Sequence, residues 1–167
     1  MDYLQTHDLS NKEIKNGENS GEPISGYVEI QEIHPTKDGG YVFLADALKG
    51  YGGRIGFALG IDKYGATTGI SITSQSETAG LGAKCEDEEF QKRFVDVYGI
   101  SETTELYSKE APKEEVLTDS EGRERHLKSK VQAITGATVT SRAITRAVKG
   151  IIFYRNYFVE KGAVNNE

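Results

Sequence analysis

The chain has 167 residues, a formal net charge of −6 and 37% hydrophobic residues. This length suits one domain with a core of its own. The acidic balance argues against nonspecific nucleic-acid binding, because the chain offers no basic stripe to displace phosphate counterions. No stretch approaches the ~20 apolar residues of a membrane span, and the N-terminus has no signal-peptide core, so the composition predicts a soluble globular protein.

Several kinds of active site are excluded by residue content. Cys85 is the single cysteine, so the chain forms no internal disulfide and holds no cysteine-rich metal or iron–sulfur site. The three histidines, His7, His34 and His126, lack ligand spacing, and no metal site is expected. The sequence also lacks a phosphate-binding G-x-x-x-x-G-K, a G-x-G-x-x-G after a strand and a credible Ser–His–Asp order.

The first half of the chain favours strands after a polar start. Residues 1–25 are polar and show no sustained periodicity, which predicts a flexible leader or linker. Apolar residues then favour strands over 28–33 and 41–45, with a turn between them. Residues 55–61 alternate with period two, and a turn leads from them to a strand near 70–72, so an antiparallel hairpin is expected.

The second half favours helices. An acidic first turn and the spacing of Phe90, Phe94, Val97 and Tyr98 predict a helix that ends at Gly99. Residues 108–130 are charged and irregular, typical of a surface excursion or loose hairpin before a short strand over 131–134. The last helix is expected from about Thr140 to Glu160, followed by a tail over 161–167. Its predicted buried side consists of Ala143, Ile144, Ala147, Val148, Ile151, Ile152 and Tyr154/Phe158.

These elements predict one α+β domain over residues 26–160, a twisted, mostly antiparallel sheet with helices packed on it. At the start of its last helix, residues 134–141 resemble a phosphate site. Gly136 permits a tight turn, and the helix supplies free N–H groups and the positive end of its dipole. Capping uses only one hydroxyl, but this segment carries four, at Thr135, Thr138, Thr140 and Ser141.

Two further glycine-rich motifs stand upstream, at residues 50–55 and 76–82. Together with residues 134–141 they resemble, in order and spacing, the FMN-binding domain family. Within that family the chain is similar to the G subunit of the Rnf electron-transport complex and the C subunit of the sodium-pumping quinone reductase. The resemblance covers about residues 26–157. Two positions differ from the usual pattern: Gln132 stands in place of Asp, and Ala79 in place of a frequent Pro.

The resemblance implies that FMN is the cofactor and that its phosphate is esterified to Thr138 by a flavin transferase, which reads the residue at position 132. It also implies that residues 77–82 border the isoalloxazine ring. The expected binding residues are therefore Thr138, Gly136, Ala137, Thr135, Thr140, Ser141, Glu77, Thr78, Gly80, Leu81 and Arg142. For residues 50–53 the interpretation stays open between a site and a glycine-rich strand entry with Tyr51 in the core.

Arg142 and Arg146 lie one turn apart near the start of the last helix, where cations oppose the dipole. Either an FMN phosphate or an acidic neighbour such as Glu77 would be their partner, or both side chains extend into water. The resemblance implies an electron-carrying subunit of an ion-pumping membrane complex, held on the outer face by an anchor that this chain lacks. The alternatives are a free-standing flavin carrier or reductase domain, and a non-redox module for another small ligand.

Overall fold

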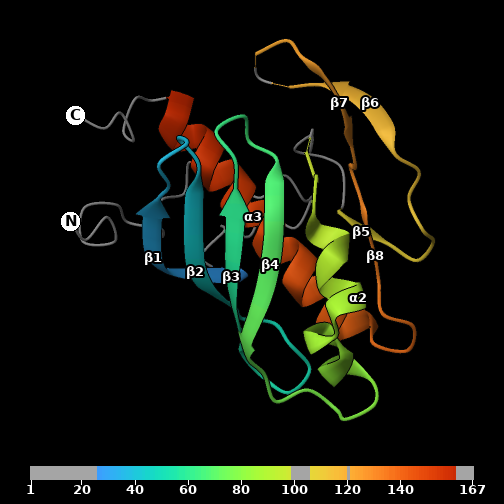
Figure 1. Ribbon diagram of the computed structural model, residues 1–167. Helices are drawn as coiled ribbons and strands as arrows, with labels where there is room; N and C mark the ends of the chain where they lie inside the picture. The colour runs from blue at the N-terminus through green and yellow to red at the C-terminus, as the bar shows by residue number, and fades with distance from the viewer. Residues whose placement is uncertain (1–25, 99–105, 120, 161–167) are drawn as a thin grey trace.

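The computed structural model describes residues 26–98, 106–119 and 121–160, with side chains to residue 156. The leader expected over 1–25 and the tail expected over 161–167 lie outside the described residues. Four strands form an antiparallel sheet in chain order (Figure 1). They are β1 (Val28–Pro35), β2 (Tyr41–Ala47), β3 (Ile55–Ile61) and β4 (Thr67–Ser74). The predicted strands and the hairpin between the last two are confirmed.

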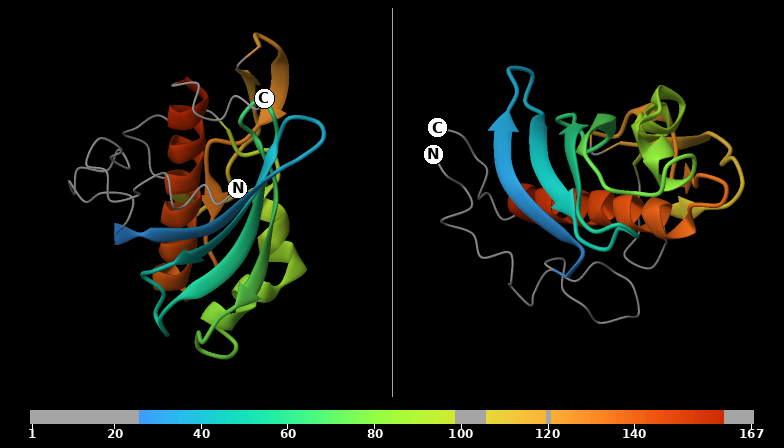
Figure 2. Two further views of the ribbon diagram at one scale, coloured as in Figure 1. Left: turned by 90° about the vertical axis from the view of Figure 1, so that its left-hand side faces the viewer. Right: turned by 90° about the horizontal axis from the view of Figure 1, so that it is seen from below.

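One long helix, α3 (Thr138–Glu160), lies against one face of the twisted sheet (Figure 2). The apolar side chains of β3 alternate toward it and are buried: Ile55, Phe57, Leu59 and Ile61. The predicted buried side of the helix is confirmed from Ala143 to Tyr154, while the side chain of Phe158 lies outside the described part. The expected α+β class is therefore correct, with the core between sheet and helix.

The helix expected to reach Gly99 is wrong beyond Phe94. Two short pieces stand in its place, α2 (Glu88–Gln91) and η3 (Lys92–Phe94), and a third, η2 (Gly82–Glu86), precedes them. Asp96 then takes a left-handed φ of 58° and donates its N–H to the Thr67 carbonyl oxygen at 2.8 Å. Thr67 in turn donates its N–H to the Val97 carbonyl oxygen at 3.0 Å, so an extended backbone pairs with the start of β4. Val97 is buried as its pattern predicted, but from an extended segment.

The remaining strands are short. β5 (Tyr107–Ser108) pairs in parallel with β8 (Val131–Gln132), and β6 (Glu115–Thr118) forms a hairpin with β7 (Glu124–Leu127). Of the two expectations for residues 108–130, a surface excursion or a loose hairpin, the β6–β7 hairpin confirms the second. The strand expected to reach residue 134 ends at Gln132, because the chain turns there toward α3.

Among the helices of the described ranges, none combines the length and the apolar character needed to cross a membrane.

Candidate functional site

A sharp turn precedes the long helix and sets where it begins. Gly136 has a φ of +78°, and the Ala137 N–H donates to the Ile134 carbonyl oxygen at 3.1 Å. α3 starts at Thr138, two residues before the position expected from the sequence. Thr138 is therefore part of the first helical turn, whose N–H groups have no partner within the helix. Those groups and the helix dipole favour an anion at this place.

The hydroxyls of the segment divide into two kinds. The Ser141 hydroxyl is buried, accepts the Ile134 N–H at 2.9 Å and donates to the Ala137 carbonyl oxygen at 2.8 Å. These two bonds hold the turn closed. The Thr135 and Thr138 side chains are exposed. Thr138 thus presents its hydroxyl to solvent at the helix start, whereas that of Ser141 is already used in folding.

The buried carboxylate of Glu77 joins two neighbouring segments. Its Oε1 accepts the Gly52 N–H at 2.7 Å, and its Oε2 accepts the Tyr51 N–H at 3.1 Å. The Thr140 hydroxyl, also buried, donates to the same Oε2. The loop between β2 and β3 is thereby fixed against the first turn of α3, with the residues that follow β4 between them.

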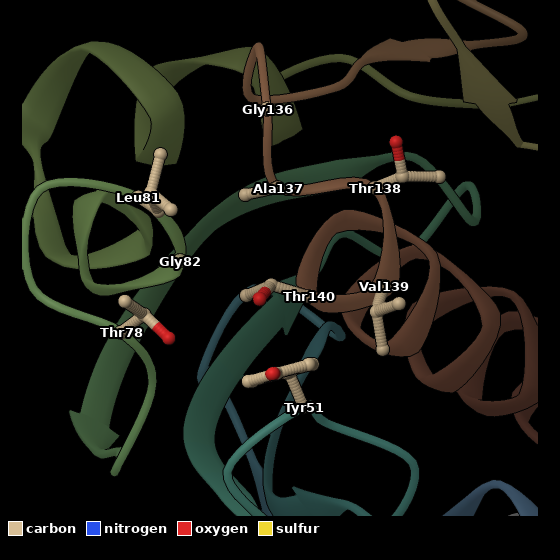
Figure 3. Close-up of a pocket in the computed structure, with 9 residues that line it drawn as sticks. All are labelled: Tyr51, Thr78, Leu81, Gly82, Gly136, Ala137, Thr138, Val139 and Thr140. Carbon is tan, nitrogen blue, oxygen red and sulfur yellow. The ribbon is translucent and has the colours of Figure 1, made fainter.

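A pocket of about 460 Å³ lies where these three segments meet (Figure 3). This volume falls in the range of small-molecule and cofactor sites, about 300–1,000 Å³. In Figure 3 the Thr138 hydroxyl points away from Tyr51 and Thr140, at the outer side of the helix start. The lining residues are Tyr51, Thr78, Leu81, Gly82, Gly136, Ala137, Thr138, Val139 and Thr140.

The pocket wall is unusually apolar for an exposed surface. Tyr51 is 74% exposed, Val139 49% and Leu81 45%. Within the described residues only two other large hydrophobic side chains are exposed, Val95 and Val116, so three of the five lie at one pocket. An exposed apolar wall beside an anion-favouring helix start suits a flat ligand with a phosphate group.

Six of the residues expected from the sequence line this pocket: Thr138, Gly136, Ala137, Thr140, Thr78 and Leu81. The other five lie around it. Glu77 and Ser141 are buried next to lining residues, and Thr135 and Gly80 are exposed neighbours in the chain. Gly80 has a φ of +74°, so the loop depends on its conformational freedom.

Arg142, the fifth, and Arg146 do not line the pocket. The Arg142 guanidinium lies 4.8 Å from the centre of the Tyr107 ring, and that of Arg146 lies 5.6 Å from the Tyr27 ring. Such contacts are cation–π interactions. Arg142 is exposed and stands one helical turn after Thr138, so it can extend toward an anion bound at the helix start. Its role at a phosphate stays a prediction.

Tyr51, Gly82 and Val139 line the pocket but are not among the eleven binding residues expected from the sequence. The sequence leaves residues 50–53 open between a site and a strand entry, and Gly82 lies in the segment expected to border the ring. The alternative that placed Tyr51 in the core is wrong, because this ring is the most exposed of the large hydrophobic side chains described. Gly82 belonged to a recognised motif, and a Cβ there would lie 2.9 Å from the Glu77 Cβ. Val139 had a usable signal, since it is an apolar residue on the polar side of an amphipathic helix.

The fold and the pocket define an α+β domain with a cofactor-sized site at the start of its long helix. The chain belongs to the FMN-binding domain family, whose match covers residues 50–152. All the lining residues fall within this range. The expected family is confirmed, and the cofactor is FMN.

Curated relatives carry names of ion-translocating oxidoreductase complexes. The chain is 35% identical over 109 residues to the G subunit of the proton-translocating ferredoxin:NAD(+) oxidoreductase complex of Clostridium ljungdahlii, covering 65% of this chain and 49% of the relative. It is 31% identical over 133 residues to the G subunit of the Na(+)-translocating ferredoxin:NAD(+) oxidoreductase complex of Acetobacterium woodii, covering 77% and 57%. The chain thus spans about half the length of these relatives.

A third relative is the G subunit of an ion-translocating oxidoreductase complex of Aliivibrio fischeri, 33% identical over 86% of this chain and 62% of the relative. Among solved structures, the chain is similar to the C subunit of the Na(+)-translocating NADH-quinone reductase from Parabacteroides distasonis. That similarity has a TM-score of 0.49 and 17% identity, over 72% of this chain and 60% of the other.

The residues present fit FMN. The helix start favours the phosphate, and the exposed apolar side chains of Tyr51, Leu81 and Val139 give a flat ring surfaces to pack on. Thr78 adds a hydroxyl at the other side of the pocket (Figure 3).

Proposed function

We propose that this chain is the FMN-carrying electron-transfer subunit of an ion-translocating membrane redox complex of the Rnf type. The observation that carries this proposal is the exposed Thr138 in the first turn of α3, beside an apolar pocket in a chain of the FMN-binding family. The names of the relatives support the kind of complex. Its partners would be the other subunits of that complex, and a membrane anchor would hold it on the extracytoplasmic face.

In the proposed subunit each part of the pocket has a separate task. Bound FMN supplies one- or two-electron chemistry, while the protein controls its position and its surroundings. The first-turn N–H groups of α3 would hold the phosphate. The flavin transferase would supply the flavin as an activated diphosphate, so that the bond from the Thr138 hydroxyl oxygen to phosphorus forms as the pyrophosphate bond breaks, the hydroxyl proton is released and the second phosphate leaves with its nucleoside. Tyr51, Leu81 and Val139, which line the pocket, would pack against the ring.

Coexpression with a flavin transferase tests the proposal. Intact mass spectrometry should show one added FMN on the wild type and none on Thr138→Ala. Gln132→Asp should raise the occupancy, because the transferase is expected to read that position. An unchanged adduct on Thr138→Ala would place the attachment elsewhere.

The absorbance spectrum separates the proposal from its rivals. Yellow colour that persists with the denatured chain means covalent flavin, and colour only in the native protein means bound flavin, as in a free-standing carrier. Colourless protein under both conditions would favour a module for another ligand and would contradict the proposal.

A further inference from the structure

Glu77 was expected to touch the flavin, but its buried carboxylate is engaged by groups of the protein itself. It accepts hydrogen bonds from the Tyr51 and Gly52 N–H groups and from the Thr140 hydroxyl. Tyr51 and Thr140 both line the pocket, and Thr78 follows Glu77 in the chain. One buried side chain therefore connects the three segments that form the pocket walls.

Glycines make room for this arrangement. A Cβ on Gly50 would lie 2.9 Å from the Glu77 Oε1, and a Cβ on Gly82 would lie 2.9 Å from the Glu77 Cβ. Real Cβ atoms do not approach so closely without displacing something. The two glycine-rich motifs, at residues 50–55 and 76–82, thus converge on the same carboxylate. A Cβ on Gly50 would also meet the Gly53 carbonyl oxygen, and one on Gly82 the Thr140 hydroxyl, so both glycines leave space for Glu77 and its neighbours.

We infer that Glu77 is a positioning residue for the flavin pocket, which sets the Tyr51 ring against the FMN ring through the backbone of residues 51 and 52. This inference rests on the proposed function. The Tyr51 side chain is mostly exposed, so packing alone does not fix it. Its place is set by the loop backbone, and the loop backbone is held by Glu77. The loss of Glu77 therefore alters the flavin environment through Tyr51.

Glu77→Gln is the primary test, because it keeps the size of the side chain and one acceptor oxygen. The new amide directs N–H donors at the Tyr51 N–H or the Gly52 N–H, which both need an acceptor. Noncovalent FMN should bind about tenfold more weakly, since a buried donor loses its partner. The visible circular dichroism of the bound flavin should change as the aromatic contact is lost.

A double-mutant cycle with Tyr51→Ala shows whether Glu77 acts through Tyr51. Tyr51→Ala alone should weaken FMN and change the same spectral band. Glu77→Gln in the Tyr51→Ala background should then add little, because the contact that it positions is already absent. Additive losses would contradict the inference and leave Glu77 with a general role in folding.

Variants of Thr140 provide a second test of the inference, which does not depend on whether the Glu77 variant folds. Thr140→Val removes the hydroxyl that donates to Glu77, whereas Thr140→Ser retains it. We expect weaker FMN binding and the altered spectrum in Thr140→Val and near wild-type values in Thr140→Ser. Equal behaviour of the two variants would overturn the inference.

Thr67→Val is the matched control for loss of stability. Thr67 also has a buried hydroxyl that bonds the backbone, to Phe94 and Val97, but it stands at the opposite end of β4 from the pocket. It should reduce stability and leave FMN affinity and spectrum unchanged. A wild-type chain that binds no FMN would refute the proposed function itself, whereas normal binding and spectrum in Glu77→Gln would refute only this inference.

Discussion

Arg93 donates from Nη1 to the backbone carbonyl oxygen of Gln132 at 3.0 Å, across 39 residues of sequence. The same nitrogen bonds the Ala133 carbonyl oxygen at 3.0 Å, and Nη2 bonds Glu89 at 3.0 Å. The guanidinium also lies 5.6 Å from the centre of the Phe90 ring. Arg93 therefore fixes the end of β8 to η3, immediately before the turn at Gly136 that presents Thr138.

Arg93→Met should lower the free energy of unfolding by about 1–2 kcal/mol, because two backbone carbonyl groups lose a charged donor that is partly exposed. Urea unfolding measures this change. Lys92→Met is the matched control, since Lys92 is exposed and forms only a surface pair with Glu88; its effect should stay within about 0.5 kcal/mol. Equal effects of the two variants would mean that Arg93 does not fix β8.

The regular parts of the fold were predictable because the spacing of their apolar residues shows which side chains are buried. Residues 55–61 alternate, and β3 buries the predicted side chains. The same signal misled beyond Phe94, since Val97 is equally buried but lies in a backbone that pairs with Thr67. An apolar spacing shows which side chains enter the core, but it does not show whether helix or extended chain carries them there.

The candidate site was predictable as a location and less so in its details. The kink at Gly136 and the helix start follow from local chemistry. Local chemistry does not show which hydroxyl remains available for a ligand. The Ser141 hydroxyl forms hydrogen bonds to Ile134 and Ala137, and these bonds exist only in the folded turn. The exposure of Tyr51 was also out of reach, since it depends on Glu77 holding a loop from 26 residues away.

Gly80→Val should weaken noncovalent FMN binding several-fold, because Val at a φ of +74° strains the loop that carries Leu81. Titration of the flavin fluorescence measures the affinity. Gly122→Val is the matched control, since Gly122 has a φ of +78° and lies in the distant turn between β6 and β7. Both variants should lose about 1–2 kcal/mol of stability. FMN binding that falls equally in both would make the Gly80 effect a general one.

Leu81→Asp should weaken FMN binding by about tenfold or more, because a carboxylate replaces an apolar contact and requires hydration. Leu81→Met, which keeps an apolar side chain of similar volume, should bind nearly as well as the wild type. The flavin absorbance of both variants should be compared at equal saturation. An unshifted spectrum and normal affinity in Leu81→Asp would make residues 77–82 a structural turn only.

Arg142→Gln combined with Arg146→Gln should weaken FMN binding more than riboflavin binding, because only FMN has a phosphate. A charge-assisted hydrogen bond contributes roughly 1.5–3 kcal/mol when shielded, and the exposed Arg142 should contribute less. The difference between the two ligands should shrink as salt rises. Lys37→Gln combined with Lys63→Gln, which removes two exposed cations from the turns at the opposite end of the sheet from the pocket, is the control for net charge. Equal loss for both ligands would exclude a phosphate contact.

The stability of the domain should fall with pH above the ordinary pKa of a thiol, and Cys85 should cause part of this fall. Burial, with smaller contributions from Glu86 and Glu77, raises the pKa of the Cys85 thiol to about 11. Between about pH 8.5 and that value the unfolded chain loses the proton while the folded chain keeps it, so stability present at lower pH is lost as pH rises.

Urea unfolding of the wild type should show a decrease of roughly 1–2 kcal/mol between pH 8.5 and 10 from this thiol. Cys85→Ala should start from a lower stability, because it leaves a small cavity, but its stability should decrease less over the same interval. The interval ends at pH 10 because burial also raises the pKa of Tyr154, to about 12. The contribution of Tyr154 to the pH dependence of stability begins near the ordinary pKa of a tyrosine. Parallel pH curves for the wild type and Cys85→Ala would show that the thiol has the same pKa in the folded and unfolded chains, contrary to its burial within η2.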